Sequence, residues 1–221
     1  MAKRNQLLLL ILTIGVFGIL NTEMGVIGLL PSIAEHFHVS VSRAGWLVSF
    51  FALAIALSGP TLPMLFSGIN RKKVMLLVLG VFVLGNVVSL LTTNFTVLLL
   101  ARIIPAWFHP IYCSMAFTVA ASSVSKEQAP KAVSKVFIGV SAGMVAGVPI
   151  ASYLDSAVSY DMAMAFFAIV NAIAFLATFL FVPSMPVGER LSYGRQFAVL
   201  TKPVLWMSIA TVVLLNSAVF G

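Results

Sequence analysis

The sequence contains few of the residues on which soluble enzymes and metal sites depend. Its single cysteine, Cys113, excludes a disulfide within the chain. Its three histidines and six acidic residues nowhere form the spacing of a metal site, and no phosphate-binding glycine loop is present. Charged residues make up only 9% of the chain, against about 25% in soluble domains. We therefore expect no metal, no cofactor and no catalytic centre of a soluble enzyme.

Apolar residues take the place of the missing charges. They make up 61% of the chain, against about 45–50% in soluble domains. The apolar runs are continuous rather than alternating, which excludes a membrane β-barrel and favours spanning helices. The net charge of +7 is spread over short loops, a pattern typical of membrane topology rather than of nucleic-acid binding. The sequence therefore predicts an all-α, multi-pass membrane protein embedded in a lipid bilayer.

The apolar runs predict a bundle of six transmembrane helices. The first run, 7–30, corresponds to about 36 Å of helix, enough to cross a bilayer core of about 30 Å. We expect Pro31 to end this span and Gly59-Pro60 to kink the second. The six spans are predicted over 7–30, 44–66, 74–92, 96–121, 136–154 and 162–182.

Three domains follow from this division of the chain. Residues 1–182 form the six-helix transmembrane domain, and residues 183–203 form a polar, proline-bounded linker. Residues 204–221 carry no charge and are too few for a complete span, which needs about 20 residues. We therefore interpret 204–221 as the start of a seventh span.

Lysine and arginine are distributed unequally between the two sides of the predicted bundle. Of the 13, eleven lie in the N-terminal tail, the 67–73 turn, the 122–135 loop and the linker. Arg43 alone lies on the other side. Because basic loops stay cytoplasmic, this pattern places the N-terminus in the cytoplasm and the protein in the inner (plasma) membrane. The basic turn after the second span contains Arg71, Lys72 and Lys73.

Two charged residues lie well inside the predicted spans. Glu23 is about 10 Å from the outer end of span one, and Arg102 is about 9 Å from the outer end of span four. A charge in a spanning helix costs at least about 2.5 kcal/mol, so such residues are functional candidates. Their opposite signs and matching depths predict that Glu23 and Arg102 are paired. The pair is either a protonatable coupling or substrate site, or a latch that holds two helices together.

Two further patterns describe the bundle. Spans 1–3 and 4–6 form two groups of opposite orientation, an inverted 3+3 repeat that recurs in transporters. In span five, Gly139, Gly143 and Gly147 recur every four residues before Pro149. This spacing predicts a smooth helix face for close packing against another helix. Gly139–Gly143 also fits the G-x-S-x-G nucleophile pattern, but its mid-helix position argues against an intramembrane enzyme.

These residues resemble motifs of the major facilitator superfamily, in particular of the bacterial drug and sugar efflux branch. The Gly139–Pro149 run resembles the antiporter motif of span five. Leu99-x-x-Arg102 resembles the span-four motif, and Asn21-Thr22-Glu23 resembles the first span of the efflux branch. The 67–73 turn departs from the family pattern, since it keeps the basic end but lacks the aspartate and the first arginine.

The resemblance implies the N-terminal half of a secondary transporter that exports a drug, sugar or nucleoside-like molecule in exchange for protons. It implies that Glu23 and Arg102 take part in proton coupling or substrate contact. The binding site would lie between two halves, so a C-terminal half or a second copy would complete it. A non-transporting, truncated remnant remains an alternative, and an intramembrane enzyme a weaker one. Candidate cavity-lining residues are Asn21, Thr22, Trp107, His109 and Tyr112.

Overall fold

The computed structural model of the chain describes residues 3–185 together with residues 203, 206–207, 210–211 and 214. This described part contains helices, turns and no strand, and six of its helical segments are long and apolar enough to cross a membrane. The predicted all-α class and the six spans are therefore confirmed. The elements between residues 3 and 181 are α1 (Lys3–Gly25), η1 (Val26–Leu29), α2 (Leu30–His36), α3 (Val41–Ala44), α4 (Trp46–Ser58), α5 (Leu62–Leu65), α6 (Arg71–Leu91), α7 (Phe95–Ser122), α8 (Ala129–Ala157) and α9 (Tyr160–Phe181).

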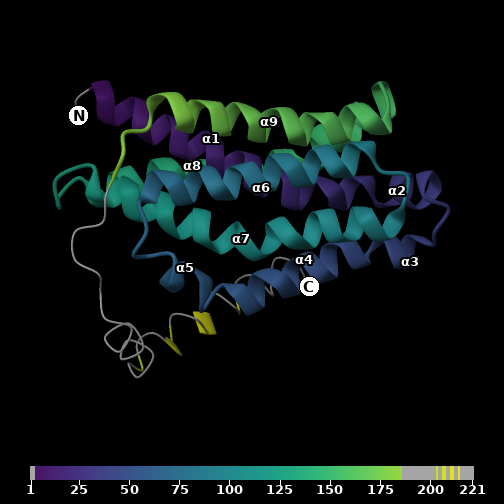
Figure 1. The fold of residues 1–221 in the computed structure, drawn as a ribbon, viewed down its shortest axis with the longest axis horizontal. Coiled ribbons are helices and arrows are strands. Elements are labelled where there is room, and N and C mark those ends of the chain that lie inside the picture. The colour runs from purple at the N-terminus through teal and green to yellow at the C-terminus, as the bar shows by residue number, and fades with distance from the viewer. Residues whose placement is uncertain (1–2, 186–202, 204–205, 208–209, 212–213, 215–221) are drawn as a thin grey trace.

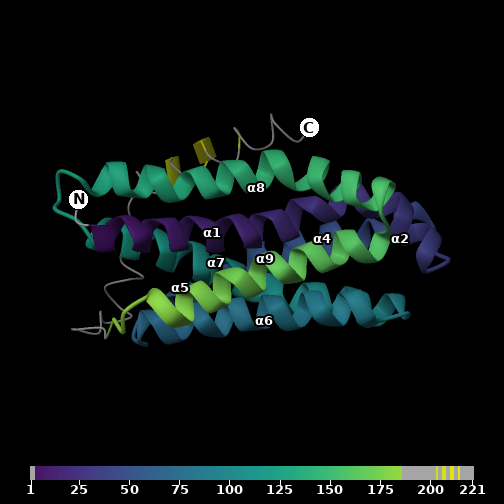
Figure 2. The same cartoon turned by 90° about the horizontal axis from the view of Figure 1, so that it is seen from above.

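The long helices lie side by side along one common direction, with their connections at the two ends (Figures 1 and 2). Helix α1 packs against α8 and α9, while α7 packs against α4 and α6. The first span thus contacts the fifth and sixth, as the fourth contacts the second and third. This exchange of partners between the two groups of three is consistent with an inverted 3+3 repeat.

Short polar residues set the start of several spans. The Asn70 side chain accepts hydrogen bonds from the backbone N–H groups of Lys72 and Lys73 at the start of α6. Asn94 caps α7 and Ser159 caps α9 in the same manner. Such caps satisfy N–H groups that have no partner within the helix, so these turns fix where the helices enter the membrane.

The first span is longer than predicted. Pro31 does not end it, because the chain passes through the 3-10 turn η1 and continues in α2 to His36. Pro31 lies in the first turn of α2, where a backbone N–H is not needed. The second span is interrupted as expected, since α4 ends at Ser58, before Gly59-Pro60. The linker beyond residue 185 and the predicted seventh span lie largely outside the described residues.

The glycine face of α8 packs directly on the backbone of α1. A Cβ atom added to Gly143 would lie 2.6 Å from Leu20 Cβ, and one added to Gly147 would lie 3.3 Å from the backbone nitrogen of Gly25. A Cβ on Gly139 would overlap the backbone carbonyl of Thr13. The predicted close helix packing is therefore present, with α1 as the partner helix.

Candidate functional site

Glu23 lies near the end of α1, two residues before Gly25 and the 3-10 turn η1. Its side chain is 18% exposed. It borders a cavity of about 240 Å³ between the first span and α4. The other residues that line this cavity are Met24, Ile27, Val48, Phe51 and Ala52. The carboxylate is therefore the one charged group on an otherwise apolar cavity wall.

The ion-pair partner of Glu23 is His109 of α7. The Nε2 atom of His109 lies 3.1 Å from Oε2 of Glu23, and the His109 side chain is 11% exposed. Within the described residues, no other ion pair is closer than 4 Å. The predicted Glu23–Arg102 pair is therefore not formed. His109 follows Arg102 by two helical turns on the same face of α7, so this face offers Glu23 an imidazole instead of the guanidinium.

Arg102 instead contacts the residue that precedes Glu23. Its Nη2 atom donates a hydrogen bond of 2.6 Å to the backbone carbonyl of Thr22. Its side chain is almost fully buried, and Nε and Nη1 have no partner within the described part of the chain. The guanidinium carbon lies 5.6 Å from the ring centroid of Phe51, whose edge also faces the His109 ring at 6.3 Å. Phe51 of α4 therefore packs against both Arg102 and His109 of α7.

A buried group of amides surrounds Thr22. Asn171 of α9 donates a hydrogen bond of 2.8 Å to the Thr22 hydroxyl, and Asn86 of α6 donates one of 3.3 Å. The hydroxyl itself donates to the Gly18 carbonyl at 2.9 Å. These bonds join α1 to the third helix of each repeat. Sequence reasoning missed both asparagines, although an amide inside an apolar span was the available signal.

None of the five predicted cavity-lining residues is among those that line the cavity beside Glu23. Asn21 is fully buried and faces α8, where its Oδ1 would lie 3.4 Å from a Cβ on Gly147. Tyr112 is fully buried in the core, with its ring packed against Gly15. Trp107 is 38% exposed on the bundle surface. The structure therefore gathers Thr22, His109, Arg102 and Glu23 at one place and leaves the aromatic residues of α7 away from the cavity.

The basic turn stands at the end of the bundle where α1 begins. Arg71 donates from Nη1 to the Ser122 hydroxyl at 3.1 Å, and Lys72 donates from Nζ to the Phe179 carbonyl at 2.8 Å. Lys73 is exposed. The turn therefore holds the start of α6 against the ends of α7 and α9.

With this geometry established, comparison with known proteins identifies the family. The sequence profile of the Major Facilitator Superfamily matches residues 12–221. The chain belongs to this superfamily. "Inner membrane transport protein YdhP" of Escherichia coli K12 is 32% identical over 212 residues, which are 96% of this chain and 54% of that protein. "Uncharacterized MFS-type transporter YtbD" of Bacillus subtilis is 33% identical over 182 residues, 82% of this chain and 46% of that protein.

A solved structure shows the same fold. The human organic anion transporter MFSD10 (TETRAN) superposes with a TM-score of 0.69 at 18% identity, over 87% of this chain and 52% of that one. The chain spans about half the length of these relatives. The resemblance seen in the sequence is therefore confirmed at the level of the superfamily and of a six-span half of its fold.

Proposed function

We propose that the chain is one half of a secondary active transporter that exports a small molecule across the inner membrane in exchange for protons. The observation that carries this proposal is the partly buried Glu23 carboxylate, which contacts His109 and faces a cavity. An acid inside a spanning helix is costly and commonly marks a proton or substrate path. Glu23 therefore serves as the group that takes up and releases the proton.

The ion pair supplies a way to couple that proton to movement. Glu23 lies on the first span and His109 on the fourth, which are the equivalent members of the two repeats. Protonation removes the negative charge of Glu23 and so changes its contact with His109. Alternating access requires one group of helices to move relative to another. Proton binding at Glu23 would thus release one of the contacts that hold α1 against α7.

Arg102 adds a buried positive charge close to this site. It brings a buried positive charge next to Thr22, and two of its N–H-bearing nitrogens have no partner in the described chain. A buried, incompletely paired cation favours negative charge nearby. Arg102 would therefore place a buried positive charge near the Glu23 carboxylate without touching it.

The cavity lining bears on the class of substrate. Apart from Glu23, its wall consists of apolar side chains, among them Ile27 and Phe51. Such a wall suits a largely apolar molecule with one polar or cationic group better than a sugar, which requires several hydrogen-bond partners. A drug-like amphiphile is therefore the substrate class that we propose.

The orientation rests on the basic residues. Arg71, Lys72, Lys126 and Lys131 lie at the end of the bundle where α1 begins, while Arg43 lies at the other end. The positive-inside rule then makes the first end cytoplasmic.

Everted membrane vesicles test this function. The vesicles come from cells that express the chain joined to the part of YdhP that has no counterpart in this chain. A dye that reports the pH gradient is followed as lipophilic cations, sugars and nucleosides are added in turn. We expect a lipophilic cation to dissipate the gradient, and Glu23→Gln to abolish the effect. Glu35→Gln is the matched control, because Glu35 is an exposed acid on α2 that does not line the cavity.

An equal response in wild type and Glu23→Gln contradicts the proposed coupling. No response to any compound favours a non-transporting chain.

A further inference from the structure

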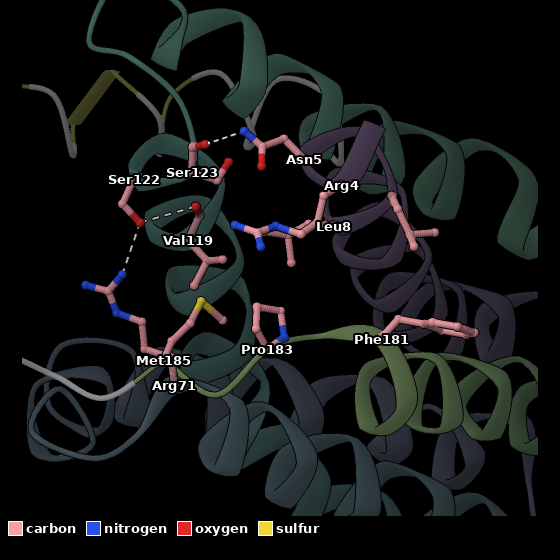
Figure 3. A pocket seen from close by; sticks show the side chains of 11 residues that line it. Arg4, Asn5, Leu8, Arg71, Val119, Ser122, Ser123, Phe181, Pro183 and Met185 are labelled. Carbon is pink, nitrogen blue, oxygen red and sulfur yellow. Dashed lines mark hydrogen bonds between the residues drawn. The ribbon is translucent and has the colours of Figure 1, made fainter. Parts of the chain in front are cut away.

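A second cavity lies at the basic end of the bundle, apart from Glu23. It has a volume of about 450 Å³ and is enclosed by the start of α1, the start of α6, the end of α7 and the residues that end and follow α9 (Figure 3). The residues that line it are Arg4, Asn5, Leu7, Leu8, Arg71, Val119, Ser122, Ser123, Phe181, Pro183 and Met185. Nothing in the proposed transport mechanism uses this cavity.

The cavity is positively charged. Among the described residues that line it, Arg4 and Arg71 are basic and none is acidic. Arg71 donates to the Ser122 hydroxyl, while Arg4 has no hydrogen-bond or ion-pair partner within the described chain. Figure 3 shows the Arg4 guanidinium reaching from α1 toward the end of α7, where Arg71 also arrives from α6. Two guanidinium groups therefore line one cavity, with no counter-ion among the described residues that line it.

The walls of the cavity are held in place by hydrogen bonds. Asn5 donates from Nδ2 to the Ser123 carbonyl at 2.7 Å, which ties the start of α1 to the end of α7. The hydroxyls of Ser122 and Ser123 donate to the carbonyls of Val119 and Ala120 at 3.2 and 2.9 Å. The acceptors in these bonds are backbone carbonyls at the end of α7, and Arg4 takes part in none of the bonds. The site is thus formed before any ligand arrives.

The rim of the cavity is apolar and continues onto the outer surface of the bundle. Leu7 is 43% exposed and Phe181 is 60% exposed. Beside them on α9, Phe179 and Leu180 are also exposed, at 56% and 64%. In a spanning bundle such side chains face the lipid tails. An occupant with an anionic head and an apolar tail can therefore use both parts of the site at once.

We infer that this cavity binds the phosphate head group of an anionic phospholipid of the cytoplasmic leaflet. Its phosphate oxygens accept hydrogen bonds from Arg4 and Arg71, since guanidinium groups match phosphate geometry. One acyl chain lies along Leu7 and Phe181. Basic pockets between spans on the cytoplasmic side suit such head groups. A free phosphate would satisfy the arginines but leave the apolar rim unused, so the rim favours the lipid.

Native mass spectrometry of the purified 221-residue chain tests the inference. The chain in detergent is titrated with phosphatidylglycerol or with phosphatidylcholine of the same acyl chains. We expect the chain to bind phosphatidylglycerol in preference to phosphatidylcholine. Arg4→Gln combined with Arg71→Gln should weaken phosphatidylglycerol binding about 30-fold, which is the usual contribution of two cations to binding an anionic lipid. The matched control is Lys126→Gln with Lys131→Gln, which removes the same charge from exposed sites outside the cavity. This control should leave the preference intact.

Two further measurements distinguish the lipid site from misfolding of the variant and from a site for free phosphate. The double variant Arg4→Lys with Arg71→Lys keeps both positive charges and should retain part of the preference for phosphatidylglycerol. That result would show that the Gln double variant loses the lipid because it loses charge and not because it misfolds. Inorganic phosphate at millimolar concentration should not displace the lipid. The inference is overturned if both charge-removing variants lose the lipid equally, if the Arg4 and Arg71 variant binds like wild type, or if inorganic phosphate competes and thereby identifies a free-anion site.

Discussion

Glu23 and His109 join the first and fourth spans through a single contact inside the bundle, with 3.1 Å between Oε2 and Nε2. Phe51 of α4 packs its ring edge-on against the imidazole. Both side chains of the pair are largely buried, at 18% exposure for Glu23 and 11% for His109. This contact therefore links the two repeats inside the bundle.

A double-mutant cycle measures this link. We expect Glu23→Gln and His109→Gln each to lower thermal stability in detergent, because each leaves the other group buried without its partner. The double variant should lose less than the sum, with a coupling free energy of about 0.5–3 kcal/mol. The same cycle between Glu23 and Arg102 should give a smaller coupling, since the structure shows no contact between them. Larger coupling to Arg102 than to His109 would contradict the structure.

The Thr22 hydroxyl is expected to stabilise the bundle through the two asparagines. Thr22→Val leaves the amides of Asn86 and Asn171 without this acceptor and should lower the free energy of unfolding by about 1–3 kcal/mol. Thr118→Val is the control, because the Thr118 hydroxyl is exposed and bonds only to Ser114 of its own helix. Its effect should stay within about 0.5 kcal/mol. Equal effects of the two substitutions in a denaturation series would show that the amide group contributes little.

The close packing of α8 on α1 gives a further test. Gly143→Ala places a Cβ 2.6 Å from Leu20 Cβ, which should destabilise the bundle by about 1–3 kcal/mol through overpacking. Gly80→Ala is the control, because a Cβ there meets only Phe175 at 3.5 Å, an ordinary contact. That change should be neutral or stabilising, since alanine favours helices. If Gly143→Ala is as stable as Gly80→Ala, the two backbones are not in contact.

The sequence predicted features that depend on local composition and spacing. The six spans follow from long apolar runs, and the glycine face of α8 follows from a four-residue repeat. The pairing of Glu23 depends instead on how α1 and α7 are rotated about their axes, and spacing along the chain does not contain that information. His109 and Arg102 share a face of α7, so depth alone did not separate them. The path through Pro31 was missed because a 3-10 turn restarts the helix.

The proposed N-in orientation predicts which turns are accessible from outside the cell. In a Cys113→Ser background, Thr93→Cys should react with an impermeant thiol reagent in intact cells, and Ile69→Cys should not. Both positions are exposed at opposite ends of α6. Permeabilised cells supply the control, because both cysteines should then react. Labelling of Ile69→Cys alone in intact cells would reverse the topology and with it the leaflet assigned to the lipid site.

The six-span unit is not expected to transport by itself. The described residues that line the cavity beside Glu23 belong to the first span and α4, and the relatives are about twice as long as this chain. A site that alternates between two sides needs a second wall, which in this fold comes from another six spans. Purified chain in liposomes with an imposed pH gradient should therefore move no substrate. Gradient-dependent uptake that disappears with Glu23→Gln would show the opposite. A second copy of the chain would then have to supply the missing wall, with one surface serving as both halves.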